Sequence, residues 1–109
     1  MIVSDDTVSK ALQYLADDPH PIAIARKDVT DAENEVSELY SRLFLAAGGS
    51  NEVRKATALQ DPLYCDAKIK EAEAIHDWER HRARVKAAEM IIEVWRSENA
   101  NARAAERIR

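Results

Sequence analysis

Glycine, proline and cysteine are scarce in this sequence: its 109 residues include two, three and one of them. So few turn-forming residues argue against a multi-stranded sheet. A single cysteine excludes an intrachain disulfide and a zinc site built from several thiolates. Because no apolar run approaches the length of a membrane span, and the first ten residues lack a signal-peptide pattern, we expect a soluble, cytoplasmic protein.

Charged residues, by contrast, make up 33% of the chain, and alanine is frequent among them. This composition favours long helices with narrow apolar seams. The charge is uneven, because residues 1–40 hold nine acidic and three basic residues, whereas residues 80–109 hold eight basic and four acidic ones. We therefore expect a single all-α domain, residues 1–109, with one acidic and one basic end.

The few glycines and prolines divide the chain into four predicted helices, at about residues 5–16, 22–47, 51–60 and 62–103. Ser4 and Ser50 are suited to cap the first and the third of them. The expected apolar faces of these two short helices are Val8, Leu12 and Leu15 in the first, and Val53, Ala56 and Leu59 in the third.

The second and fourth predicted helices carry residues at heptad spacing, which is typical of a coiled-coil seam. In the second helix the seam positions are Ile22, Ala25, Val29, Ala32, Val36, Leu39, Leu43 and Ala46. In the fourth they are Tyr64, Ala67, Glu71, Ala74, Trp78, His81, Val85, Ala88, Ile92 and Trp95. Because the short helix between them can reverse the chain, we predict an antiparallel, coiled-coil-like hairpin. Its predicted shared core is Val29, Val36, Leu39, Trp78, Val85 and Ala88.

The fourth predicted helix is longer than its partner, which spans roughly 39 Å at about 1.5 Å per residue. The surplus carries Ile92 and Trp95, whose apolar surface is too large to leave in water. We expect the first helix and another chain to cover it. Ile92 and Trp95 are therefore predicted to lie at an oligomer interface, with a homodimer as the favoured assembly.

Few residues of the sequence are suited to metal binding or catalysis. His76 and His81 are five residues apart and diverge on a helix, so they do not match the i, i+4 pair of a helical zinc site. His81 and Glu71 lie in the seam, where a role in helix register is favoured; a pH-sensitive contact at His81 is the alternative. The sequence has no glycine-rich phosphate loop and no recognisable nucleophile with its base. We predict a non-enzyme without metal or cofactor.

Two charged groups remain as candidate binding residues. Asp28, Asp31, Glu35 and Glu38 lie off the seam on the outer side of the second helix, so they can meet a basic partner without disturbing the core. They are the predicted partner-binding residues. Arg103 and Arg107, near the basic end, are the alternative, as nucleic-acid contacts.

Several segments from Leu45 onward have a distinctive pattern. They are AAGGSNEVRKATALQDPLY and RVKAAEMIIEVWRSENANARA, with an Asp-x-x-Tyr helix start at Asp61 and a late Trp-Arg-Ser at Trp95. This part of the chain resembles small all-helical proteins of tailed phages and prophages, often encoded near recombination genes. The resemblance implies a phage-encoded protein acting in the host cytoplasm, and it carries no activity with it.

A small phage protein without an active site is expected to act by binding. The favoured function is inhibition or modulation of a host nucleoprotein machine, as an anti-CRISPR protein does when an acidic surface occupies the nucleic-acid groove of a Cas subunit. The alternative is an accessory role in phage recombination, in which the basic last helix contacts single-stranded DNA or its binding protein.

Overall fold

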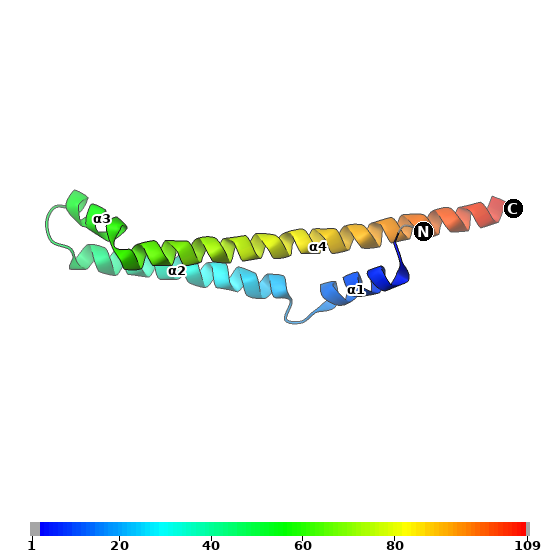
Figure 1. Ribbon diagram of the computed structural model, residues 1–109, viewed down its shortest axis with the longest axis horizontal. Coiled ribbons are helices and arrows are strands. Elements are labelled where there is room, and N and C mark those ends of the chain that lie inside the picture. Colours follow the sequence, from blue (N-terminus) through cyan, green and yellow to red (C-terminus); the bar gives the residue numbers. More distant parts are fainter. Residues whose placement is uncertain (1–2, 109) are drawn as a thin grey trace. The chain divides into compact units, whose positions relative to one another are not determined.

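The structure, a computed structural model, describes residues 3–108 and has no strand among them (Figure 1). Its helices are α1 (Asp5–Ala16), α2 (Pro21–Ala46), α3 (Asn51–Gln60) and α4 (Pro62–Ile108). The predicted all-α class is confirmed. Helix α2 begins and ends one residue earlier than predicted, and α4 continues beyond the predicted end at residue 103.

Local sequence explains where the helices begin. The Ser4 and Ser50 hydroxyl oxygens each accept a hydrogen bond from the backbone N–H three residues later, at 3.1 and 3.3 Å, as helix N-caps do. At α4 the Asp61 carboxylate accepts the N–H two residues later at 2.8 Å, and proline occupies the first helical position. After α2, Gly49 has a φ of 102°, a left-handed conformation that glycine adopts without strain.

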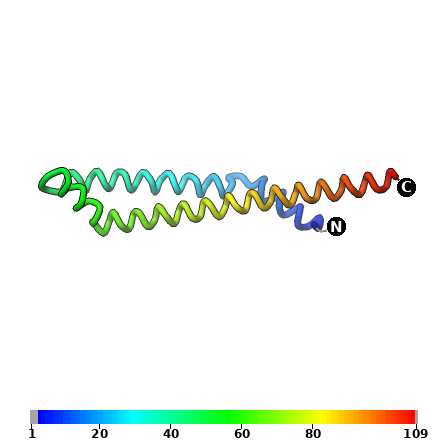
Figure 2. Tube along the Cα trace, turned by 90° about the horizontal axis from the view of Figure 1, so that it is seen from above, coloured from blue at the N-terminus to red at the C-terminus, as the bar shows by residue number. Residues whose placement is uncertain are grey.

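The helices form two compact units. Unit 1 comprises residues 1–21 and 80–109, and unit 2 comprises residues 22–79. Helix α4 therefore contributes its first part to unit 2 and its second part to unit 1. Within unit 2, α2 and the first part of α4 lie side by side in both views (Figures 1 and 2). Among the described residues, none of the helices combines the length and the apolar character that a bilayer crossing needs.

The core of unit 2 is built mainly from small residues. Its buried side chains are Ala25, Val29, Val36, Ala58 and Ala67. Contacts between α2 and α4 include aromatic rings: the ring centres of Tyr40 and Tyr64 lie 6.0 Å apart, and the Arg26 guanidinium lies 4.9 Å from the Trp78 ring centre. Of the predicted core residues in this unit, Val29 and Val36 are buried, while Leu39 and Trp78 are half-buried.

The core of unit 1 is centred on one aromatic side chain. Ala11 and Tyr14 of α1 pack with Ala88 of α4, and the partly buried residues around them are Leu15, Val85, Ile91 and Ile92. The prediction that Val85 and Ala88 share a core with the second helix was therefore wrong, because α1 packs against this part of α4. The predicted face of α1 was right at Val8, which is buried, and wrong at Leu12, which is 51% exposed, whereas Ala11 and Tyr14 are buried. The face is rotated because a small side chain at position 11 allows the helices to approach closely, and the large ring at position 14 then fills the contact.

The predicted face of α3 was also wrong. Val53 is 53% exposed, and Ala56 and Leu59 are exposed as well. The helix is buried instead at Ala58, which has no accessible surface. As at Ala11 in α1, a small side chain marks a point where helices approach closely.

Candidate protein-binding face

The outer side of α2 carries the four predicted partner-binding carboxylates. Asp28, Asp31, Glu35 and Glu38 are all exposed. Their spacing of three and four residues places them on one side of the helix, away from the buried Val29. We call these four residues the acidic face. It can meet another molecule without any change in the packing of unit 2.

Basic residues lie at both ends of the acidic face. Lys27 Nζ donates a hydrogen bond to Asp31 Oδ2 at 2.8 Å. That hydrogen bond and the charge of Asp31 raise the pKa of Lys27 above its usual value, and the charge of Asp28 adds to the effect. Arg42 follows Glu38 by four residues, the spacing at which helix neighbours face one another. The negative charge is therefore densest between Asp28 and Glu38.

Another surface, with two aromatic rings, lies at the C-terminal end of α2. Tyr40, Ser41, Phe44 and Leu45 line a shallow hollow of about 410 Å³. A second hollow, of about 460 Å³, includes Ser41 together with Glu38 and so adjoins the acidic face. Leu45 is 73% exposed. We call Tyr40, Phe44 and Leu45 the aromatic end.

Sequence reasoning did not select the aromatic end. Tyr40 and Phe44 follow the seam residues Leu39 and Leu43 directly, so the heptad assigns them no place in the core. Their ring centres lie 6.1 Å apart. The sequence did contain one indication, namely that Tyr40 and Phe44 are large apolar residues outside the seam. Such residues are candidates for a second contact.

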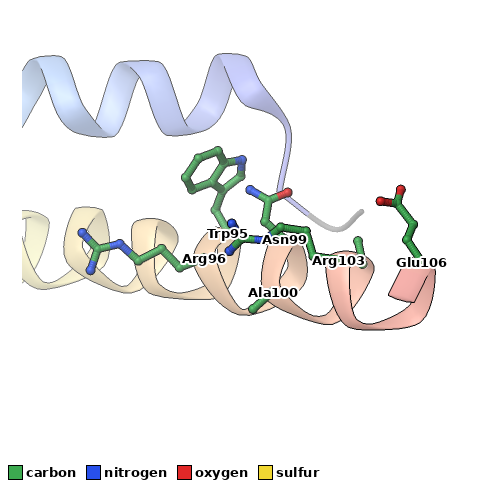
Figure 3. A pocket seen from close by; sticks show the side chains of 7 residues that line it. Trp95, Arg96, Asn99, Ala100, Arg103 and Glu106 are labelled. Carbon is green, nitrogen blue, oxygen red and sulfur yellow. The ribbon is translucent and has the colours of Figure 1, made fainter. Parts of the chain in front are cut away.

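The second candidate surface is on α4 in unit 1. An open hollow of about 750 Å³ is lined by Trp95, Arg96, Asn99, Ala100, Ala102, Arg103 and Glu106 (Figure 3). Trp95 and Asn99 point toward α1, and Trp95 Nε1 donates a hydrogen bond to Asp5 Oδ1 at 3.4 Å. Arg103 lines this hollow. Arg107 is exposed one turn further along and is not part of its lining.

The two residues predicted at an oligomer interface are half-buried within the chain. Ile92 packs against the cluster of Ala11, Tyr14 and Ala88, and Trp95 contacts Asp5. Helix α1 therefore covers part of the surface of Ile92 and Trp95, as we expected. Coverage by a second chain stays a prediction.

Both polar seam residues of α4 have partners within the chain. Tyr14 Oη and His81 Nδ1 lie 3.5 Å apart, a long hydrogen bond. Glu71 Oε1 accepts a hydrogen bond from Lys68 Nζ at 2.8 Å, and this bond, together with the charge of Glu71, raises the pKa of Lys68. Residues 3–108 contain no group of three or more histidine, cysteine or carboxylate side chains that could hold a metal ion.

Comparisons with protein-family models, with curated proteins and with solved structures found no match to this chain. The candidate sites therefore rest on the geometry and charge of the chain's own residues.

Proposed function

We propose that this chain is a non-enzymatic binding protein that docks the acidic face of α2 on a basic surface of another protein. One observation supports this most directly: the four carboxylates are exposed together on one side of α2 while the buried residues of that helix lie elsewhere. Such a face can engage a partner with no cost in core packing. Exposed charges of this kind mainly accelerate association.

The proposed partner is a nucleic-acid-binding subunit of a host machine. A groove that binds phosphates is lined by lysine and arginine, so a row of carboxylates on a helix matches it in charge. With the resemblance to phage proteins, this favours inhibition of a Cas subunit, as an anti-CRISPR protein would achieve. The phage origin is part of the proposal.

We propose further that α2 and the first part of α4 run antiparallel, as a hairpin. Tyr40, near the end of α2, contacts Tyr64, near the start of α4. Arg26, near the start of α2, lies over Trp78, further along α4. The order of these two contacts supports opposite helix directions. A hairpin would hold the acidic face on a stiff rod, which lowers the entropy lost on binding.

Phage plating tests the proposed inhibition. The chain is expressed in bacterial strains that each carry one active type of CRISPR–Cas system, and a phage targeted by that system is plated on them. The expected result is restored plaque formation in one strain. The variant Asp28→Lys with Glu35→Lys should lose most of this protection, because the reversed charges repel the basic groove.

The matched control carries the same charge change at another site. Glu52→Lys with Glu73→Lys reverses two exposed carboxylates, one on α3 and one on α4, and it should protect as the unmodified chain does. Absence of protection in every strain contradicts the anti-CRISPR proposal. Equal loss in both variants shows that net charge, not the acidic face, controls the effect.

A second function is favoured by the hollow on α4. Trp95 offers an aromatic ring, and Arg96 and Arg103 offer guanidinium groups around the same opening. Single-stranded nucleic acid binds to surfaces that combine these groups. We therefore retain, as the alternative, a recombination accessory that contacts single-stranded DNA, either alone or with its binding protein.

Fluorescence anisotropy of a labelled oligothymidine distinguishes the two functions. The alternative requires binding that weakens steeply as salt is raised, and that is lost in Arg103→Ala with Arg107→Ala. The favoured function requires that this double variant keeps its plaque phenotype. DNA binding by the unmodified chain, with an acidic-face variant that stays fully active, would replace the favoured function by the alternative.

A further inference from the structure

The second part of α4 carries another heptad stripe, on its exposed side. Every residue of the stripe is exposed, and its members are Ala83, Ala87, Met90, Val94, Ser97 and Asn101. Met90 is 67% exposed and Val94 is 39% exposed, so the stripe presents two neighbouring large apolar side chains to solvent. We call these six residues the outer stripe.

Helix α1 borders the outer stripe at Ala87, which lines a hollow together with Ala11 and Tyr14, and it leaves Met90 and Val94 exposed. On a helix of 3.6 residues per turn, Met90 lies about 160° around the axis from both Ala88 and Ile92. These two residues belong to the cluster that packs against α1. Within unit 1, α4 therefore has two apolar sides, and among residues 3–108 α1 packs against one of them.

The sizes of the outer-stripe residues fit a second copy of the same helix. When two such helices pair antiparallel, with Met90 of one opposite Ala87 of the other, Val94 falls opposite Ala83 of the other. Each contact occurs twice because of the two-fold symmetry. A large side chain then meets a small one in every central layer, as dense packing requires. A parallel pair in register would instead place methionine on methionine and alanine on alanine.

The charges beside the outer stripe fit the same arrangement. Lys86 and Glu93 are exposed and lie seven residues apart on one flank of the stripe. Seven residues is too far for a contact within one helix. In the antiparallel pair described above, Lys86 of each copy lies beside Glu93 of the other, which gives two opposite-charge contacts. In a parallel pair Glu93 would lie beside Glu98 of the second copy, and like charges would repel.

We propose that two copies of this chain pair antiparallel through the outer stripe of α4. The proposal is independent of the acidic face and of the proposed function. It also differs from the predicted interface at Ile92 and Trp95, which lies on the side of α4 that faces α1. A second copy fits better than an unrelated partner because both the size pattern and the charge pattern complement themselves under one two-fold axis.

A charge-swap series tests the pairing by sedimentation equilibrium. Lys86→Glu and Glu93→Lys each turn two opposite-charge contacts into two like-charge contacts. Each single variant should weaken dimerisation about tenfold, which corresponds to several tenths of a kcal/mol at each exposed contact. The double variant restores opposite charges across the dimer, so its dissociation constant should return close to that of the unmodified chain.

Three results would overturn the proposal. They are a monomeric unmodified chain at concentrations up to about 1 mM, single variants that dimerise normally, and a double variant as weak as the singles. A dimer that Trp95→Ala dissociates and that Lys86→Glu leaves intact would assign the interface to the other side of α4.

Disulfide cross-linking tests the direction of the pair. The cross-linking variants are made in a Cys65→Ser background, which removes the exposed native thiol. In the proposed antiparallel pair, the two-fold axis passes between Ala87 and Met90. A variant with both Ala87→Cys and Met90→Cys should therefore form intermolecular disulfides on oxidation, because these two positions face each other across the axis. Ser97→Cys should not, because its two copies lie about 25 Å apart along the axis at 1.5 Å per residue. Cross-linking of the Ser97→Cys variant as well would indicate a parallel pair and overturn the proposal.

Discussion

The two units of this chain bury their residues in different ways. In unit 2 the burial is distributed over α2, α3 and the first part of α4, through alanines and valines at regular spacing. In unit 1 the buried side chains are Val8, Ala11, Tyr14 and Ala88, and the contacts centre on Tyr14. Its ring packs with Ala11 and Ala88, and the Arg84 guanidinium and the His20 ring centre lie 4.0 and 4.9 Å from its ring centre. A distributed core tolerates the loss of one side chain, whereas a core centred on one ring depends on it.

The contrast also bears on function. Because unit 2 buries α2 through a narrow line of small residues, most of the circumference of that helix stays available for the acidic face and the aromatic end. Unit 1 uses one side of α4 to hold α1, and only the opposite side stays available. A seam of small residues covers only a narrow part of the helix surface, and the rest of that surface stays exposed.

The largest expected effect is at the centre of unit 1. Tyr14→Ala should lower the free energy of unfolding by about 3 kcal/mol, since it removes a buried aromatic ring together with its contacts. Urea unfolding followed by circular dichroism measures the change, and hydrogen exchange should show that α1 loses protection before α2 does.

The control for this substitution is Tyr14→Phe, which keeps the ring and removes only the hydroxyl that faces His81 Nδ1. It should cost about 1 kcal/mol or less, as expected for one long hydrogen bond. If Tyr14→Phe were as damaging as Tyr14→Ala, the hydroxyl contact and not the ring would hold α1.

The matching substitution in unit 2 is Val29→Ala. Val29 is the largest fully buried side chain among the described residues, and its loss should cost about 2 kcal/mol. The same urea experiment gives the value. Leu45→Ala, which truncates a side chain exposed at the end of α2, is the control and should be close to neutral. A larger effect at Val29 than at Tyr14 would invert the comparison between the units.

Sequence periodicity predicted the long helices far better than the short ones. The heptads of α2 and α4 place Ala25, Val29, Val36, Ala67 and Ala88 at seam positions, and all five are buried, although Ala88 packs against α1 and not against α2 as predicted. Over several heptads, residues assigned to a wrong face would soon include charged side chains, so a long apolar repeat fits one face only. Helices α1 and α3 have 12 and 10 residues, and so few turns fit several faces almost equally well.

The candidate binding surfaces were also predicted only in part from the sequence. The exposure of Asp28 and Glu35 on one side of α2 follows from the helix period and the position of the seam. The aromatic end could not be found in that way. Tyr40 is adjacent in sequence to a seam residue, and its contact with Tyr64 brings together residues 24 positions apart along the chain. Only the packing of two helices shows such a contact.

A smaller effect on the free energy of unfolding is expected at the two serine caps, one in each unit. Ser4→Ala and Ser50→Ala each remove one side-chain acceptor for a backbone N–H and should each cost about 1 kcal/mol. Hydrogen exchange should localise the first loss to α1 and the second to α3. Ser4→Asp and Ser50→Asp retain an acceptor and should keep most of the stability. A loss of protection throughout both units after one cap substitution would show that the units unfold together.

The smallest effect concerns the surface of unit 2. Asp31 raises the pKa of Lys27 above the ordinary value of 10.5. Because the folded pKa is the higher one, the pair contributes to stability at pH values below 10.5, and this contribution is lost as the pH rises through the folded pKa. Asp31→Asn should bring the pKa of Lys27 back toward 10.5, which a side-chain NMR titration measures.

The unfolding free energy itself should change least of all in this last experiment. The Lys27 and Asp31 side chains are 74% and 59% exposed, so water and salt screen their attraction. Glu71→Gln is the parallel test at Lys68, where the Glu71 side chain is only 16% exposed, and it should lower the pKa of Lys68 in the same direction. If Asp31→Asn destabilised the protein as much as Val29→Ala does, the stability of unit 2 would depend on its surface charges, and the contrast between its distributed core and the single ring of unit 1 would fail.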